Sequence, residues 1–136
     1  MAIRTPTIRY VGERTSEIVW TGLLNGDEGA GVRQLYSDLR LVQVQGTFGA
    51  GGNARIQGSL VGVVGTDTAP ATGVASADWH FIHDMQGNNL DFDGAAANLR
   101  IEKIDEGPCW IRPVITAGDG TTSLTVRLVT RDWGPR

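Results

Sequence analysis

Cysteine and lysine are almost absent from this chain of 136 residues, which contains only Cys109 and Lys103 of these two types. A single cysteine excludes an intrachain disulfide, so packing must supply the stability of the fold. Cys109 has no base near it in the sequence, which favours a small buried hydrophobic residue over a reactive thiol. The other basic residues are arginines. Arginine is frequent at contacts with carboxylates and other chains, although a GC-rich coding bias would produce the same excess.

Long hydrophobic runs and a strong charge of one sign are also missing. No run approaches the ~20 apolar residues of a membrane-spanning helix. The N-terminal MAIRTPTIRY lacks the apolar segment of a signal peptide. The formal net charge of −3 is too small to indicate nucleic acid or an anionic membrane as a partner. We therefore expect neither nucleic acid nor a membrane among the partners of this chain.

Glycine, threonine and valine are abundant, with 19 glycines, and this composition favours strands and turns over helices. Roughly eight short strand-like runs recur about every ten residues, which is typical of a sandwich or barrel. A chain of this length is expected to form one domain. The predicted fold is a single-domain, all-β, antiparallel β-sandwich of jelly-roll or Ig-like type. We place an extended N-terminal arm at residues 1–14, the sandwich at 15–131 and a tail at 132–136.

The clearest structural unit is the segment 109–131. Two runs with period-two alternation flank the sequence AGDG, which supplies the positive-φ residues of a tight turn. This pattern predicts a β-hairpin. Pro113 cannot donate a main-chain hydrogen bond, so it predicts that its strand lies at a sheet edge or is bulged there. An open edge would invite pairing with another chain, whereas a capped edge would not.

A second hairpin is predicted over residues 38–60, around the turn GAGG. Further strands are predicted at 15–21, 78–85, 90–92 and 99–105, and glycine-containing turns at 25–31 and 86–89. Residues 61–77 are mostly small and polar and predict a long loop, a feature that is often functional in compact domains. Residues 1–14 indicate an extended arm that does not pack by itself and that a partner would order.

Calcium binding is suggested by half of a motif. Asn89, Asp91, Asp93 and Gly94 match the first half of a calcium-binding loop, in which oxygens at alternate positions and a glycine turn surround the ion. The twelfth position of such a loop needs a bidentate acid, and here it holds Arg100. The pattern therefore favours a polar turn over a calcium site.

A weak transition-metal set could form from Asp78, His80 and Asp84 on one strand face, with His83 on the other face. Residues two apart along a strand are separated by about 7 Å, so these side chains need a further ligand to share one ion. No nucleophile motif and no phosphate-binding loop is present. The sequence predicts no cofactor, no metal site and no enzymatic activity.

Four tryptophans, Trp20, Trp79, Trp110 and Trp133, could form a stacking platform for a sugar. Their scattered positions favour core packing for the first three. Trp133 lies in the tail, where an interface role is expected.

Four pieces of the sequence carry a resemblance in their order and spacing: VQVQGTFGAGGNARIQGS at 42–59, Trp79 followed by Asp84, Gln86, Gly87 and Asn88, IRP at 111–113, and TAGDGTTSLTVRL at 116–128. Together they resemble small structural proteins of tailed bacteriophages that are encoded among the head genes, some of which are similar to capsid decoration (cement) proteins. The resemblance covers residues 15–131. The loop at 61–77 departs from the short Asn-Asp-Gly turn of that family, so no functional residue is carried over.

The resemblance implies a β-sandwich without catalysis that assembles as trimers over the capsid lattice. The expected function is to decorate and stabilise the capsid, at the virion surface, in contact with the major capsid protein and with further copies of this chain. Such a protein is made in the cytoplasm of the host bacterium. A tail or neck component and a carbohydrate-binding surface module are the alternatives. The predicted interface residues come from the arm, the proline-containing strand and the tail: Ile3, Arg4, Ile8, Arg9, Tyr10, Pro113 and Trp133.

Overall fold

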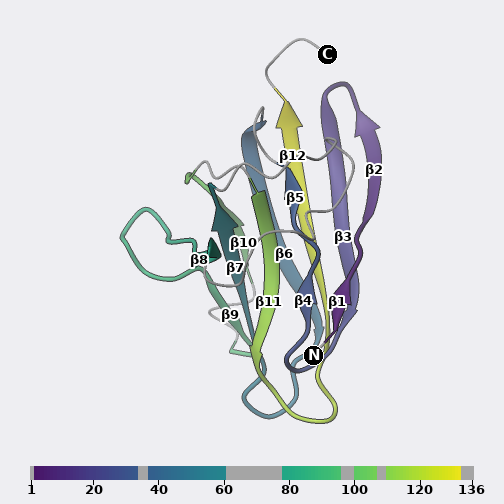
Figure 1. Ribbon diagram of the computed structural model, residues 1–136, viewed down its shortest axis with the longest axis vertical. Helices are drawn as coiled ribbons and strands as arrows, with labels where there is room; N and C mark the ends of the chain where they lie inside the picture. The colour runs from purple at the N-terminus through teal and green to yellow at the C-terminus, as the bar shows by residue number, and fades with distance from the viewer. Residues whose placement is uncertain (1, 34–36, 61–77, 96–99, 107–109, 133–136) are drawn as a thin grey trace.

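The structure, a computed structural model, describes residues 2–33, 37–60, 78–95, 100–106 and 110–132 (Figure 1). Its elements are strands. In chain order they are β1 (Ile3–Arg4), β2 (Thr7–Gly12), β3 (Thr15–Leu23), β4 (Glu28–Gly29), β5 (Val32–Arg33), β6 (Ser37–Thr47), β7 (Asn53–Ser59), β8 (His80–Phe81), β9 (Asp91–Asp93), β10 (Ile101–Lys103), β11 (Trp110–Ala117) and β12 (Ser123–Asp132).

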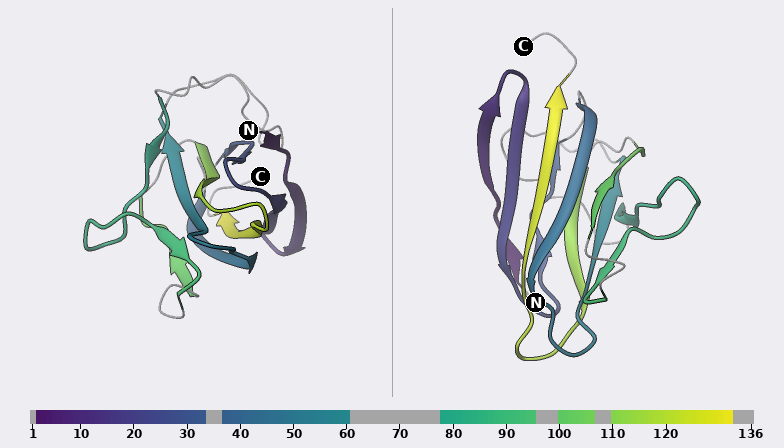
Figure 2. Two further views of the ribbon diagram at one scale, coloured as in Figure 1. Left: turned by 90° about the horizontal axis from the view of Figure 1, so that it is seen from below. Right: turned by 180° about the vertical axis from the view of Figure 1, so that it is seen from behind.

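These strands form two sheets that pack face to face (Figures 1 and 2). The seven-stranded sheet follows the order β1–β4–β11–β7–β8, with β5 also pairing with β11 and β9 with β7. The five-stranded sheet has the order β10–β6–β12–β3–β2. The described strand pairs are antiparallel except for β1 with β4. The predicted β-sandwich is confirmed. It has more strands than expected because β1, β4, β5 and β8 have two residues each, too few for a periodic signal.

Period-two alternation builds the core between the sheets. On β3, Ile18 and Trp20 are buried, whereas the alternate residues Glu17 and Val19 are only half-buried. Each fully buried large apolar side chain stabilises the fold by roughly 1.5–3 kcal/mol. The five-stranded sheet contributes Val42, Val126 and Leu128 to this core, and the seven-stranded sheet contributes Ile56, Ile111 and Ile115.

The two predicted hairpins are instead β-arches, in which the chain crosses from one sheet to the other. β11 lies in the seven-stranded sheet and β12 in the five-stranded sheet, and β6 and β7 are divided in the same way. β12 pairs with β6, and β11 pairs with β7. The strand and turn positions were therefore predicted well, but the pairing was wrong. Alternation and a turn signal are the same for a hairpin and an arch, and the partner across the sheet decides between them.

The loops of the two arches lie together at one end of the sandwich, at the bottom of Figure 1, and Asp119 joins them. Its carboxylate accepts hydrogen bonds from the N–H of Ala50 at 2.7 Å and from the hydroxyl of Thr121 at 2.7 Å. The Thr122 hydroxyl donates to the carbonyl oxygen of Phe48 at 2.7 Å. Gly49 has a φ of +69°, and a Cβ at this position would lie 2.2 Å from Asp119 Oδ1. This contact therefore requires glycine at position 49.

Pro113 is buried inside the seven-stranded sheet, so its predicted edge position is wrong. β7 pairs along one side of β11, and the short strands β5 and β4 pair with the other side, before and after Pro113. The amide of Ile115 donates to the carbonyl oxygen of Asp27 at 2.9 Å. Residues two apart in a strand direct their amides to the same side. The nitrogen of Pro113 therefore faces the interruption between β5 and β4.

The segment 78–106 departs further from the predicted strand pattern. β8 covers only two residues, and Trp79 and Ile82 on either side of it are both buried, so the expected alternation over 78–85 is wrong. The predicted turn that follows is present. Its geometry depends on Asp84, whose carboxylate accepts the N–H groups of Gln86 and Asn88, each at 2.9 Å.

Replacing Gly29 by alanine should destabilise the fold. A Cβ at Gly29 would lie 2.5 Å from Pro113 Cδ and 2.7 Å from Trp20 Cδ1, in a buried place with no room to relax. We expect Gly29→Ala to lower the free energy of unfolding by roughly 1–3 kcal/mol, as overpacking does. Urea unfolding measures this change. Gly12→Ala is the matched control, because nothing lies within 4 Å of a Cβ there. If the two substitutions changed the free energy of unfolding equally, the close contacts around Gly29 would be contradicted.

Acid should weaken the junction of the arches through Asp119. The N–H of Ala50, followed by the hydroxyl and N–H of Thr121, lowers the pKa of Asp119 from 3.8 to about 2. The stability from this group is present above pH 3.8 and is lost as the pH falls towards about 2. We expect Asp119→Asn to unfold at lower urea concentration at neutral pH, and to lose less stability than the wild type on acidification. Parallel pH profiles for the two proteins would contradict this account.

Candidate functional site

Residues 2–12, here called the N-terminal margin, line one side of the sandwich. β1 pairs with β4 at the end of the seven-stranded sheet, and β2 pairs with β3 at the end of the five-stranded sheet. One continuous segment therefore reaches from one sheet to the other (Figures 1 and 2). The predicted arm is extended, but the expectation that it does not pack is wrong. The strands with which it pairs, β3 and β4, lie outside residues 2–12, so the sequence of this segment does not indicate that it packs.

Asp27 holds the first residues of this margin. Its side chain is only 6% exposed, and it accepts hydrogen bonds from the Ala2 N–H at 3.1 Å, from Arg4 Nε at 2.9 Å and from the Leu24 N–H at 2.9 Å. Burial raises the pKa of Asp27, but the hydrogen bonds from Leu24, Arg4 and Ala2 outweigh it and the pKa lies below its ordinary value. An ionised, buried carboxylate thus fixes both the main chain and a side chain of the margin.

The charges of the N-terminal margin are paired within the chain. Arg4 binds Asp27, and Arg9 Nη2 lies 3.0 Å from Glu17 Oε1. Glu17 Oε2 also lies 3.7 Å from Arg127 Nε. The exposed pairs of Glu17 with Arg9 and Arg127 contribute roughly 0–1 kcal/mol to stability. Their main consequence is that another chain would meet a surface without unpaired charge at these positions.

Apolar side chains are exposed along the same margin. Ile3 and Tyr10 are each 59% exposed and Val11 is 48% exposed. Ile8, in contrast, is half-buried and packs against the core. The margin therefore combines strand edges, paired charges and open apolar surface, which are features of a contact surface between proteins.

The structure brings five of the predicted interface residues together on this margin: Ile3, Arg4, Ile8, Arg9 and Tyr10. Pro113 does not belong to it, because it is buried in β11. Cys109, the loop 61–77 and the tail with Trp133 lie outside the described residues. Asp132, which the sequence assigned to the tail, is the last residue of β12.

A polar cluster lies on the seven-stranded sheet and centres on Arg112. Its Nη1 donates to Glu28 Oε2 at 2.8 Å and its Nε to Gln57 Oε1 at 2.9 Å, and the guanidinium lies 4.4 Å from the ring centroid of Trp79. Burial lowers the pKa of Arg112, and Glu28 opposes this shift. Breaking such a buried pair leaves an uncompensated charge, so the cluster fixes the relative positions of β4, β7 and β11.

Trp20, Trp79 and Trp110 are 1%, 6% and 2% exposed, which confirms that the first three tryptophans are packed inside. Trp20 Nε1 donates to the carbonyl oxygen of Ala30 at 3.0 Å. None of these three indoles offers an open face on which a sugar could stack.

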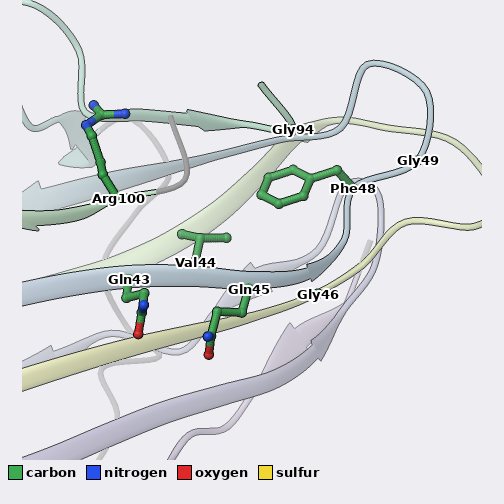
Figure 3. A pocket seen from close by; sticks show the side chains of 8 residues that line it. All are labelled: Gln43, Val44, Gln45, Gly46, Phe48, Gly49, Gly94 and Arg100. Carbon is green, nitrogen blue, oxygen red and sulfur yellow. The ribbon is translucent and has the colours of Figure 1, made fainter. Parts of the chain in front are cut away.

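An open slot of about 570 Å³ lies beside β6, close to the first arch loop. Figure 3 shows Val44 and Phe48 on one side of β6, facing the slot, with Gly94 and Arg100 across from them. Arg100 pairs with Glu102, and its guanidinium lies 5.2 Å from the ring centroid of Phe92. The lining supplies apolar surface and an already paired arginine. Among the described residues that line it, none is of the kinds that act as nucleophile or general base.

The metal sets considered from the sequence are not assembled. Within the described ranges, no three His, Cys, Asp or Glu side chains lie close enough together to hold an ion. Asp91 of the calcium half-motif is in β9, where its Oδ2 lies 3.7 Å from Arg55 Nη2. Asp84 of the transition-metal set hydrogen bonds within its own turn.

Three residues that organise the molecule were not identified from the sequence: Asp27, Arg112 and Asp119. The two aspartates follow glycine in turns, where a carboxylate commonly accepts main-chain hydrogen bonds, and this signal could have marked them. Nothing near Arg112 in the sequence indicates its partners, because Gln57 and Glu28 lie 55 and 84 residues away.

Comparison with family models, with curated proteins and with solved structures found no match to this chain. Over the ranges that the structure covers, there is no helix with the length and hydropathy that a membrane crossing requires.

Replacing Asp27 by asparagine should loosen the N-terminal margin. An amide cannot present two anionic oxygens to three donors, so Arg4 and the main chain of Ala2 lose their common partner. We expect Asp27→Asn to reduce the free energy of unfolding by roughly 1.5–3 kcal/mol, the range for hydrogen bonds to charged groups, and to speed amide hydrogen exchange in residues 2–4. Glu13→Gln, at an exposed position in the turn between β2 and β3, is the control. Unchanged exchange in the Asp27 variant would contradict the anchoring role.

Proposed function

We propose that this chain is a non-enzymatic structural protein of a tailed-phage virion that decorates and stabilises the capsid. One observation carries the proposal. The four sequence pieces of the resemblance, spread from residue 42 to residue 128, form one connected set of contacts in the structure. Neighbouring positions are what a shared packing arrangement would require, and this supports the proposal.

The contacts between the pieces are specific. Ala50 of the first piece bonds to Asp119 of the last, and Gln57 of the first piece bonds to Arg112 in the IRP piece. Arg112 in turn lies against the ring of Trp79, from the second piece. The residues that carry the resemblance therefore build the frame of the sandwich. They support a shared architecture more strongly than they support a particular contact with a partner protein.

The proposed mechanism of stabilisation is mechanical. A decoration protein binds across neighbouring capsid subunits and adds contact free energy that disassembly must overcome. A domain whose loops and margins are fixed in advance loses little conformational entropy on binding. The tied arch loops and the anchored N-terminal margin meet this requirement.

The proposed partners are the major capsid protein and further copies of this chain, as trimers if the resemblance extends to assembly. The proposed location is the outer surface of the capsid, after synthesis in the host cytoplasm. A component of the tail or neck is the alternative, because the same rigid sandwich would serve there and the frame residues do not distinguish the two.

Immunogold labelling of phage particles that encode this chain tests the proposal. We expect label over the surface of the heads, and particles lacking the gene serve as the control. Label confined to the tail or neck would support the alternative, and unlabelled particles would reject a virion role. A capsid-stabilising role further predicts that heads lacking the protein release DNA at lower temperature, and that adding purified protein restores their thermal resistance.

A further inference from the structure

The strands at the edges of the two sheets differ in length. At the ends of the seven-stranded sheet, β1 and β8 have two residues and β9 has three. The five-stranded sheet ends in β10, with three residues, and in β2, with six. Very short edge strands are one means by which proteins prevent unwanted strand pairing. In the described part of the chain, β2 is the one edge strand that lacks this protection.

The sequence and position of β2 suit pairing with another strand. It reads TIRYVG, rich in β-branched and aromatic residues and without proline. β3 lies on one side of it, and no described strand pairs with the other side, as the outermost purple strand in the right-hand view of Figure 2 shows. Alternate residues of such a strand direct their main-chain N–H and C=O groups to the open side.

The side chains around this edge favour a second copy of the chain as the partner. Tyr10 and Val11 are 59% and 48% exposed, so pairing would bury apolar surface from both copies. Arg9 is neutralised by Glu17 at 3.0 Å, which reduces the repulsion between two identical edges. A strongly charged edge would favour a partner of opposite charge, and this edge is not of that kind.

We propose that the β2 edges of two copies pair in antiparallel fashion about a two-fold axis, which joins the two five-stranded sheets into one continuous sheet. A closed two-fold contact uses the same surface on both copies. The inference rests on the self-association in the proposed function, and it gives a two-fold pair in place of the trimer that the resemblance implies. It is tested on the purified protein without capsids. Failure of this test would leave the virion role standing, and failure of the labelling experiment would leave the two-fold contact standing.

Symmetry fixes the register of this pairing. A two-fold axis perpendicular to the sheet keeps each side chain on its own face. Residues directly opposite each other must therefore be an even number of positions apart, so at the axis one residue of β2 lies opposite the same residue of the second copy. An axis at Arg9 would place two arginines directly opposite each other, which is destabilising. An axis at Tyr10 places Arg9 opposite Val11 of the second copy and removes that repulsion. Of these two central positions of β2, the geometry therefore favours Tyr10.

Charge substitutions at Val11 test the contact by light scattering over a range of concentrations. The wild type should reach twice the mass of one chain. Val11→Lys places a cation opposite Arg9 of the second copy and should weaken association by about tenfold or more, whereas Val11→Glu should retain or tighten it. Ile101→Lys, at a 62% exposed position on the opposite edge, should have no effect. A monomeric wild type, a trimer, or an equal response to lysine and glutamate would each overturn the proposal.

A disulfide across the axis tests the register independently of affinity. Opposite residues of antiparallel strands have Cα atoms about 4.5–5.5 Å apart, within the disulfide range of about 4.4–6.8 Å. In a Cys109→Ser background, Tyr10→Cys should form a covalent dimer on mild oxidation, and Ile101→Cys should not. Circular dichroism melting verifies that both variants are folded. A folded Tyr10→Cys variant that stays monomeric on oxidation would overturn the register.

Discussion

The stacking of one β-arch on another is the constraint on which the rest of this structure depends. β6 pairs with β12 in one sheet while β7 pairs with β11 in the other, so the two arches cross the core side by side. Asp119 and Thr122 join their loops at the end of the sandwich. The remaining described strands attach to this frame at its sides. Separating the sheets would break the loop contacts and expose the apolar side chains between the layers, so the sandwich is stabilised as one unit.

The acidic turn before β4 connects this frame to the periphery. Asp27 and Glu28 are adjacent in the chain, yet their carboxylates bind different arginines. Asp27 holds Arg4 and the start of the N-terminal margin, and Glu28 holds Arg112 within the seven-stranded sheet. A two-residue strand such as β4 forms few main-chain hydrogen bonds, and these charged contacts add to its attachment. The position of the margin therefore follows from the position of the frame.

This arrangement suits a protein whose role is contact. Arg4 and Arg9 of the N-terminal margin pair with carboxylates, and the exposed Tyr10 and Val11 lie on the six-residue edge strand β2. Main-chain edges bind other strands through hydrogen bonds that do not depend on side-chain identity, while neighbouring side chains select the register. A fixed sandwich can thus offer an ordered binding edge, which is consistent with the proposed role on a capsid.

The sequence by itself determined the all-β class, most of the long strands and the turns, because alternation and glycine-containing turns are local properties. It also predicted Ile8, Arg9 and Tyr10 as interface residues, and this stays a prediction. It could not determine that the segments around AGDG and GAGG form arches, since a hairpin and an arch share the same local pattern. Nor could it reveal that Pro113 is buried, because the interruption between β4 and β5 is what accommodates it there. Which strands pair, and which carboxylate meets which arginine, depend on segments far apart in the chain, and only the tertiary structure decided them.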